Sequence, residues 1–300
     1  MTVFGWAAME TILKGRKGTV SIAPDLPTVL IGKRINRAGR RRAAGEPAVS
    51  YIEVARNEAL AQVAAGADVI NVSIDATDLN EVMLLPSLLE VIQETIEVPI
   101  SIETPHPGAL AAALAVCRGK PLVNAVNGAE QCLNEVLPLV AEHGAVVVGC
   151  CMDEEGIPDD PYKRLEIASR IVAHAQALGI PCEDVLINCL TQTIETNSHA
   201  ALVTLETVRL VRDELGCNMT LDVSGVSSEL PNPTALHQTF LPVVVAEGVN
   251  APIVDVARDR QTILAMDMLL GRDAFATRYI RYYHYIRSGI RSLIDWELVG

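Results

Sequence analysis

Short apolar runs alternate with longer amphipathic stretches along almost the whole chain. Each run is continuously apolar and rich in Val and Ile, which is typical of a strand buried on both faces of a parallel sheet. The predicted strands are residues 29–32, 68–72, 99–103, 121–126, 145–150, 184–188, 219–223 and 252–256. Between and after them, helical periodicity covers residues 51–65, 80–95, 108–117, 129–142, 162–178, 199–215, 234–247 and 259–270.

This regular alternation predicts the fold class. About eight βα units in one chain point to an α/β fold, the (β/α)8 TIM barrel. A doubly wound open sheet is the alternative, but no GxGxxG follows the first predicted strand, which counts against a dinucleotide-binding domain. Gly66, Gly144, Gly179 and Gly216 each follow a predicted helix, where a left-handed C-cap is expected.

The pattern also predicts how the chain is divided. We expect an N-terminal extension over residues 1–27, a single barrel domain over residues 28–291 and a C-terminal tail over residues 292–300. The extension is expected to cap the bottom of the barrel or to wrap around its side. Residues 273–291 predict an extra C-terminal helix with an aromatic stripe, which either packs against the barrel or forms a subunit interface.

Composition narrows the functional classes. The chain has 300 residues, is half hydrophobic and carries a formal net charge of -13, which disfavours binding to nucleic acid. Its seven cysteines form no CxxC pair, which favours buried thiols in a reducing compartment. The start of the chain lacks a basic region before its apolar part, and no apolar run reaches the length of a membrane span. We therefore expect a cytoplasmic protein that does not bind membranes.

Candidate chemistry lies at the ends of the predicted strands, because a TIM barrel places its active site at the carboxyl ends of its strands. Asn71 and Asn124 lie near the ends of two of these strands, and Asn188 ends a third. An amide offers a donor and an acceptor side by side, which suits a flat heterocycle better than a phosphate or a metal. No pattern of paired histidines and carboxylates predicts a metal site.

Six motifs, in order along the chain, resemble the pterin-binding family. That family includes dihydropteroate synthase, the folate domain of cobalamin-dependent methionine synthase and the methyltetrahydrofolate:corrinoid methyltransferases, and the last group is the most similar. The motifs are IGKRIN (31–36), AAGADVINVS (64–73), VPISIETP (98–105), GKPLVNAVNG (119–128), EDVLINCL (183–190) and SGVSSELPN (224–232). Together they cover nearly the whole predicted barrel.

The resemblance implies a function. The related methyltransferases pass a methyl group between N5 of tetrahydrofolate and the cobalt of a corrinoid (cobalamin) carried by a separate protein, and they are usually homodimers. It implies catalytic roles for Asn124 and Glu103. It implies a substrate-binding role for a wider set of residues: Asn36, Asn71, Ser73, Asn124, Asn188, Ser224, Gly225, Ser227 and Asn232. Arg34 also keeps the family's opening motif.

Several positions depart from the family. Asn71 and Asn188 replace aspartates, Glu103 replaces an aspartate, and Lys33 replaces a glutamate. Pro233 replaces an arginine that is often found in that loop. Gly225 replaces an asparagine that the methyltransferases place near N5. Losing one group that stabilises the reacting atoms typically costs two to three powers of ten in rate, about 3–4 kcal/mol.

Two functions therefore stay open. The first is a methyltransferase that tolerates these substitutions. The second is a diverged member of the same family, with an altered ligand, with reduced or no methyltransferase activity, or as a non-catalytic partner of a corrinoid protein. Dihydropteroate synthase is less favoured, because it needs a basic motif after the seventh strand and SGVSSELP holds no base.

Overall fold

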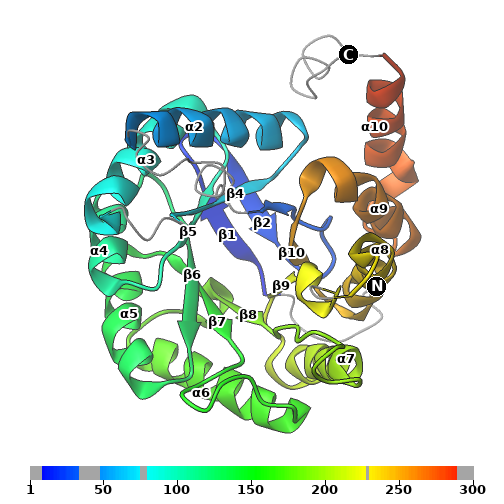
Figure 1. Ribbon diagram of the computed structural model, residues 1–300. Coiled ribbons are helices and arrows are strands. Elements are labelled where there is room, and N and C mark those ends of the chain that lie inside the picture. Colours follow the sequence, from blue (N-terminus) through cyan, green and yellow to red (C-terminus); the bar gives the residue numbers. More distant parts are fainter. Residues whose placement is uncertain (1–8, 34–47, 75–79, 228–229, 289–300) are drawn as a thin grey trace.

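The computed structural model describes residues 9–33, 48–74, 80–227 and 230–288. Eight parallel strands close into a barrel in the order β10-β3-β4-β5-β6-β7-β8-β9 (Figure 1). They are β3 (Ile31–Gly32), β4 (Val69–Ser73), β5 (Ile100–Glu103), β6 (Leu122–Asn127), β7 (Val146–Cys150), β8 (Val185–Asn188), β9 (Met219–Asp222) and β10 (Ala251–Val254). The TIM barrel predicted from the sequence is confirmed, and each predicted strand overlaps an observed one. The limits of the domain stay a prediction.

The helices form an outer ring around the barrel (Figure 1). They are α2 (Ala48–Ala64), α3 (Glu81–Thr95), α4 (Pro107–Val116), α5 (Glu130–His143), α6 (Pro161–Ala177), α7 (Ala200–Leu210), α8 (Pro233–Glu247), α9 (Val256–Leu269) and α10 (Thr277–Ser288). The helix predicted over residues 199–215 changes at Val211 into a π-helical turn, η2 (Val211–Leu215). Gly216 ends that turn with φ of 65°, the left-handed conformation expected of it.

Apolar residues of the strands pack in two separate cores, because side chains alternate between the two faces of a strand. Ile70 and Val72 of β4 point outward and pack in the core between the sheet and the helices. Val69 of the same strand points inward and packs with Val146 and Leu186 inside the barrel. Burial on both faces explains why the strands read as continuous apolar runs.

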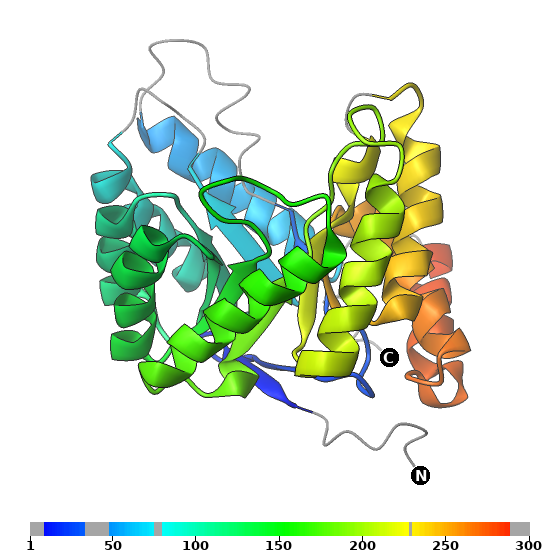
Figure 2. The same ribbon diagram turned by 90° about the horizontal axis from the view of Figure 1, so that it is seen from below.

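A two-stranded antiparallel hairpin closes the amino-terminal end of the barrel. It consists of β1 (Thr11–Lys14) and β2 (Thr19–Ile22) and lies across the lower end of the strands in Figure 2. Leu13 and Ile22 are fully buried in the inner core. The side chain of Asn218 holds the hairpin in place, because its Nδ2 donates to Met9 O, Thr11 Oγ1 and Ile22 O at 2.8–3.0 Å. The sequence left open whether this segment caps the bottom of the barrel or wraps around its side, and it did not predict the two strands.

The C-terminal helix α10 packs against α9 through one face. Arg260 of α9 lies over the ring of Tyr282, with 5.4 Å from its guanidinium carbon to the ring centroid. Asp273 fixes the start of α10, because its carboxylate accepts hydrogen bonds from Arg278 N and Tyr279 N, both at 3.0 Å. The opposite face of α10 is solvent-exposed. A subunit interface on that face, and the homodimer, stay predictions.

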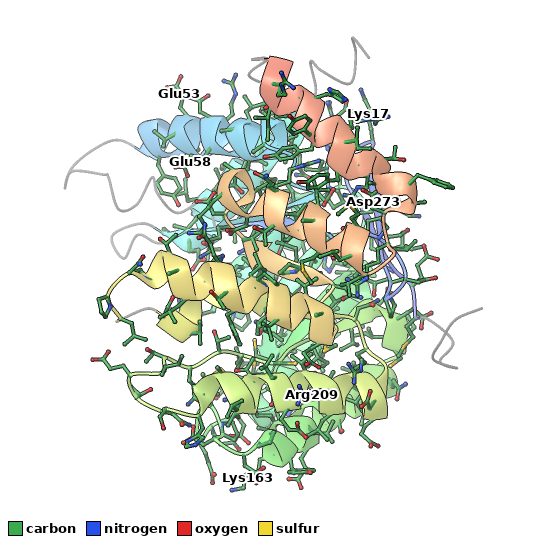
Figure 3. The ribbon with its side chains drawn as sticks, turned by 90° about the vertical axis from the view of Figure 1, so that its right-hand side faces the viewer. Lys17, Glu53, Glu58, Lys163, Arg209 and Asp273 are labelled. Atoms are coloured by element: carbon green, nitrogen blue, oxygen red, sulfur yellow. The ribbon has the colours of Figure 1, made fainter. Side chains whose placement is uncertain are left out.

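The outer faces of the helices carry charge. Figure 3 shows Arg209 on the outward side of α7, and its guanidinium pairs with Glu247 of α8 at 2.7 Å. Exposed pairs of this kind each contribute little stability. Within the described part of the chain, no helix combines the length and the apolar character needed to cross a bilayer.

Candidate functional site

A cavity of about 810 Å³ opens at the carboxyl ends of the barrel strands. Its lining brings together six of the residues predicted from the sequence: Asn71, Glu103, Asn124, Asn188, Ser224 and Gly225. They come from five different strands or strand ends, and Asn124 and Glu103 are register partners on neighbouring strands. The side chain of Asn124 makes no hydrogen bond to any other described residue and is thereby available to a ligand.

One wall of the cavity is formed by Asn71 of β4 and Glu103 of β5. The amide of Asn71 donates from Nδ2 to Glu103 Oε2 at 2.6 Å. Its Oδ1 is buried and has no partner among the described residues. An unpaired buried oxygen of this kind is costly unless a ligand or a water satisfies it. Asn71 therefore presents an acceptor, while its donor orients Glu103.

Asn188, at the end of β8, is oriented in the opposite sense. Its Oδ1 accepts a hydrogen bond from the backbone of Leu190 at 3.0 Å. This bond uses one lone pair of the amide oxygen and holds the side chain in an orientation that leaves its N–H groups for a partner in the cavity. The residue therefore offers a donor, where the family's usual aspartate would offer only acceptors.

The mouth of the cavity at β9 carries an ion pair. Lys33 Nζ lies 3.5 Å from Asp222 Oδ1 and donates to Ser224 Oγ at 2.8 Å. Ser224 in turn donates from its hydroxyl to Asp222 Oδ1 at 2.6 Å. The three residues join the ends of β3 and β9, which are separated in the barrel by β10.

Gly225 has a close neighbour in place of a side chain. A β-carbon on Gly225 would overlap Thr191 Oγ1 and would lie 3.3 Å from Thr191 Cβ and 3.2 Å from Thr191 O. The hydroxyl of Thr191 is fixed there by donating to the backbone oxygen of Asp222 at 2.9 Å. The loop after β8 thus fills the space that a side chain at position 225 would need.

A fully buried arginine holds that loop. Arg164 of α6 is 0% exposed and donates to the backbone oxygens of Cys189 and Leu190 at 2.9 and 3.0 Å. It also donates to Gln192 Oε1 at 2.7 Å. Burial lowers the pKa of Arg164 from its ordinary value. These bonds on both sides of Thr191 fix the position of its side chain.

The remaining predicted residues lie elsewhere. Ser73 and Ser227 are buried but do not line the cavity, and the hydroxyl of Ser227 donates to Pro233 O at 3.2 Å. Asn232 is exposed and begins α8 with φ of 52°. Asn36, together with Arg34, lies outside the described residues. For these positions, contact with a ligand stays a prediction.

Thiol chemistry finds little support in the described part of the chain. Burial raises the pKa of Cys150 to about 12, so its thiol is protonated at neutral pH. Cys151, its neighbour, is fully buried. No cluster of three or more potential ligating side chains is found among the described residues.

Sequence reasoning missed Thr191 entirely and gave Asp222 no specific role. Thr191 lies in TQT after the sixth barrel strand, a stretch without a chemical signature. The available signal was indirect, because a glycine in a binding loop often marks the close approach of another group. The identity of that group depends on the fold.

This geometry can be set beside known proteins. The family described as "Pterin binding enzyme" matches residues 32–255, and the chain belongs to this family. The methylcorrinoid:tetrahydrofolate methyltransferase of Eubacterium limosum is 27% identical over 270 residues, covering 87% of this chain and 98% of that protein. The methionine synthase of Mycobacterium tuberculosis is 27% identical over 279 residues, covering 84% of this chain and 23% of that much longer protein.

Solved structures support the fold alone. The dihydropteroate synthase of Vibrio fischeri superposes with a TM-score of 0.68 at 16% identity, covering 87% of this chain and 99% of that one. The dihydropteroate synthase of Xanthomonas albilineans in complex with 7,8-dihydropteroate gives a TM-score of 0.66 at 16% identity, covering 83% of this chain and 96% of that one.

Proposed function

We propose that this protein transfers a methyl group between N5 of tetrahydrofolate and the cobalt of a corrinoid carried by a partner protein. The observation that carries the proposal is the cavity at the barrel mouth, where amide and carboxylate side chains from several strands converge. The proposal is also supported by similarity to the Eubacterium limosum methyltransferase, which extends over 98% of the length of that protein.

The cavity suits a pterin ring in size and in polarity. A volume of about 810 Å³ is within the range of small-molecule sites. Asn71 Oδ1, a buried oxygen without a described partner, belongs to a residue of the cavity lining. Such an atom favours a ligand with an N–H group over an apolar one.

The residues of the chain are assigned distinct tasks. Glu103, oriented by Asn71, accepts N–H groups from the edge of the ring. Asn124 provides both a donor and an acceptor beside it, and Asn188 donates to an acceptor of the ring. These contacts fix the ring so that N5 faces the mouth, where the partner protein brings the corrinoid.

The transfer requires N5 to become a good leaving group. The bond between N5 and the methyl carbon breaks with both electrons remaining on N5, so a proton on N5 avoids a negative charge there. In this direction the corrinoid supplies the electron pair that forms the new bond to the methyl carbon. Transfer in the reverse direction releases that proton from N5.

A calorimetric titration of the chain with methyltetrahydrofolate tests the binding step. We expect binding in the micromolar to millimolar range, and no heat at millimolar ligand would overturn the proposal. Absorbance changes of cob(I)alamin mixed with protein and methyltetrahydrofolate then test the transfer. Asn124→Ala is expected to lower the rate strongly, and an unchanged rate would remove the role assigned to Asn124.

A second function, a family member with an altered ligand or with little transferase activity, is favoured by two observations. Asn188 presents a donor where the family's aspartate presents acceptors. Thr191 occupies the space of a side chain at position 225. Tight binding of another heterocycle, with no binding of any folate, would support this function instead.

A further inference from the structure

At the β9 side of the cavity, the hydroxyl protons of two side chains are already used in hydrogen bonds within the protein. Thr191 donates its single hydroxyl proton to Asp222 O at 2.9 Å. Ser224 donates its own to Asp222 Oδ1 at 2.6 Å. A hydroxyl has one proton and two lone pairs, so each oxygen can now only accept a hydrogen bond from a ligand.

The carboxylate of Asp222 adds further hydrogen-bond acceptors to this side of the cavity. It lines the cavity with Thr191 and Ser224, and a carboxylate at neutral pH only accepts hydrogen bonds. Lys33 is the nearby donor, but its ammonium is directed to Ser224 Oγ at 2.8 Å and does not line the cavity. We call Thr191, Asp222 and Ser224 the acceptor wall.

The position of the wall is built into the fold. Arg164 donates to the backbone oxygen of Leu190, just before Thr191, and to the side-chain oxygen of Gln192, just after it. The absence of a side chain at Gly225 lets Thr191 approach this closely, because a β-carbon there would overlap Thr191 Oγ1. Glycine at 225 and threonine at 191 therefore depend on each other, because the hydroxyl of Thr191 occupies the space of a side chain in the turn after β9.

Resting on the proposed function, we infer that Thr191 is a specificity-determining residue that selects reduced folates over oxidised ones. In a fully oxidised pterin ring, both N5 and N8 carry bare lone pairs, so whichever of the two faces the wall would meet acceptors without a proton between them. In tetrahydrofolate both nitrogens carry an N–H group, so the nitrogen at the wall can donate to it. A site built to hydrogen-bond an N–H discriminates strongly against the analogue that lacks it.

The test compares tetrahydrofolate with folate, which differ only in the reduction of the ring. Calorimetric titrations under anaerobic conditions give both dissociation constants for the native chain, Thr191→Val and Thr191→Ser. Valine keeps the shape of threonine but removes the oxygen, whereas serine keeps the oxygen. We expect the native chain and Thr191→Ser to prefer tetrahydrofolate by at least about tenfold, and Thr191→Val to lose about tenfold of that preference.

Each outcome decides between the inference and the function. An unchanged preference in Thr191→Val, or a native chain that binds both folates equally, overturns the inference and leaves the proposed function standing. A native chain that binds neither folate overturns both. Thermal melting of each variant identifies a folding defect. If Thr191→Val does not fold, Thr191→Ser is compared with the native chain instead. Because serine retains the oxygen, a loss of the preference in Thr191→Ser would contradict the inference.

Discussion

Asn71 and Glu103 share a hydrogen bond of 2.6 Å across neighbouring strands, deep in the mouth of the barrel. The amide in this position carries no charge and donates a hydrogen bond to the carboxylate. Asn71→Asp would instead place two carboxylates at hydrogen-bond distance, and each would raise the pKa of the other. We expect the variant to be less stable by roughly 1–3 kcal/mol at pH 7.

This loss has a defined pH dependence. A carboxylate whose pKa is raised in the folded state destabilises the fold above its unfolded pKa, so the deficit should shrink as the pH is lowered towards about 4. Urea unfolding at pH 7 and pH 4.5 measures it. Asn188→Asp is the matched control, because it adds the same charge where Leu190 N already donates. Equal deficits in both variants at pH 7 would refute the explanation.

The contact between Gly225 and Thr191 predicts a coupling between two substitutions. Gly225→Ala forces Thr191 to rotate and to give up its hydrogen bond to Asp222 O, at a cost of about 1 kcal/mol. In the background of Thr191→Gly, the same change meets no side chain and should cost much less. A double-mutant cycle on unfolding free energies measures the difference.

Gly108→Ala provides the reference for that cycle. Gly108 lies in α4, and a β-carbon there meets nothing within 4 Å. Alanine in a helix is favoured over glycine by roughly 0.5–1 kcal/mol, so this variant should be stabilised. Additive effects of Gly225→Ala and Thr191→Gly would show that the two residues do not compete for space.

Arg164 predicts the sensitivity of the loop that carries Thr191. Arg164→Met keeps an apolar chain of similar length but removes the arginine's hydrogen bonds to the backbone oxygens of Pro158 and Cys189, whereas Leu190 O keeps the hydroxyl of Thr204 as a donor. Each buried group left unsatisfied costs about 1–3 kcal/mol, so we expect a loss of several kcal/mol. Ligand affinity should fall as well, since Thr191 loses its support.

The same helix supplies a control for Arg164. Arg170 pairs with Asp153 at 3.0 Å, and its side chain is 43% exposed. Surface pairs contribute about 0–1 kcal/mol, so Arg170→Met should have a small effect on urea unfolding. Similar losses from the two substitutions would indicate that burial of Arg164 has no special importance.

Asp259 gives a prediction at acid pH. Burial raises its pKa, but hydrogen bonds from His237 and from Arg258 outweigh burial and hold the pKa at about 2. Arg258 donates to both carboxylate oxygens, at 2.7 and 2.8 Å. A carboxylate with a lowered pKa stabilises the fold above its unfolded pKa, and this stability is lost as the pH falls from about 4 towards 2.

Asp259→Asn should therefore cost roughly 2 kcal/mol at pH 7, and the difference from the native chain should shrink below about pH 4. Unfolding curves at pH 7, 4 and 3 follow it. Asp25→Asn removes the same charge from an exposed position and controls for net charge. A constant difference across this range would contradict the assignment.

The barrel was predictable because its strands are buried on both faces and its helices are amphipathic, two patterns that depend on near neighbours in the sequence. Gly144 and Gly216 adopt the left-handed conformation for the same local reason. The hairpin strands escaped prediction, since β1 alternates buried and exposed positions over only four residues. So short an alternation is weak evidence of a strand.

The site was predictable only in part. Asn71, Glu103, Asn124 and Asn188 could be placed at one rim because parallel strands bring their carboxyl ends together. Which atom of each amide faces the cavity depends on a third group, such as Leu190 N, and no spacing in the sequence encodes it. Thr191 lies 34 positions before Gly225 in the chain, so only the folded barrel reveals that they share one space.

The hairpin that fills the amino-terminal end of the barrel has a kinetic consequence. Leu13 and Ile22 close that end, so both substrates of the proposed reaction must use the opposite opening. A folate that binds deep in the cavity must enter before a protein docks over it and must leave after that protein departs. Methyl transfer on this scaffold should therefore follow a compulsory order, with the folate first on and last off.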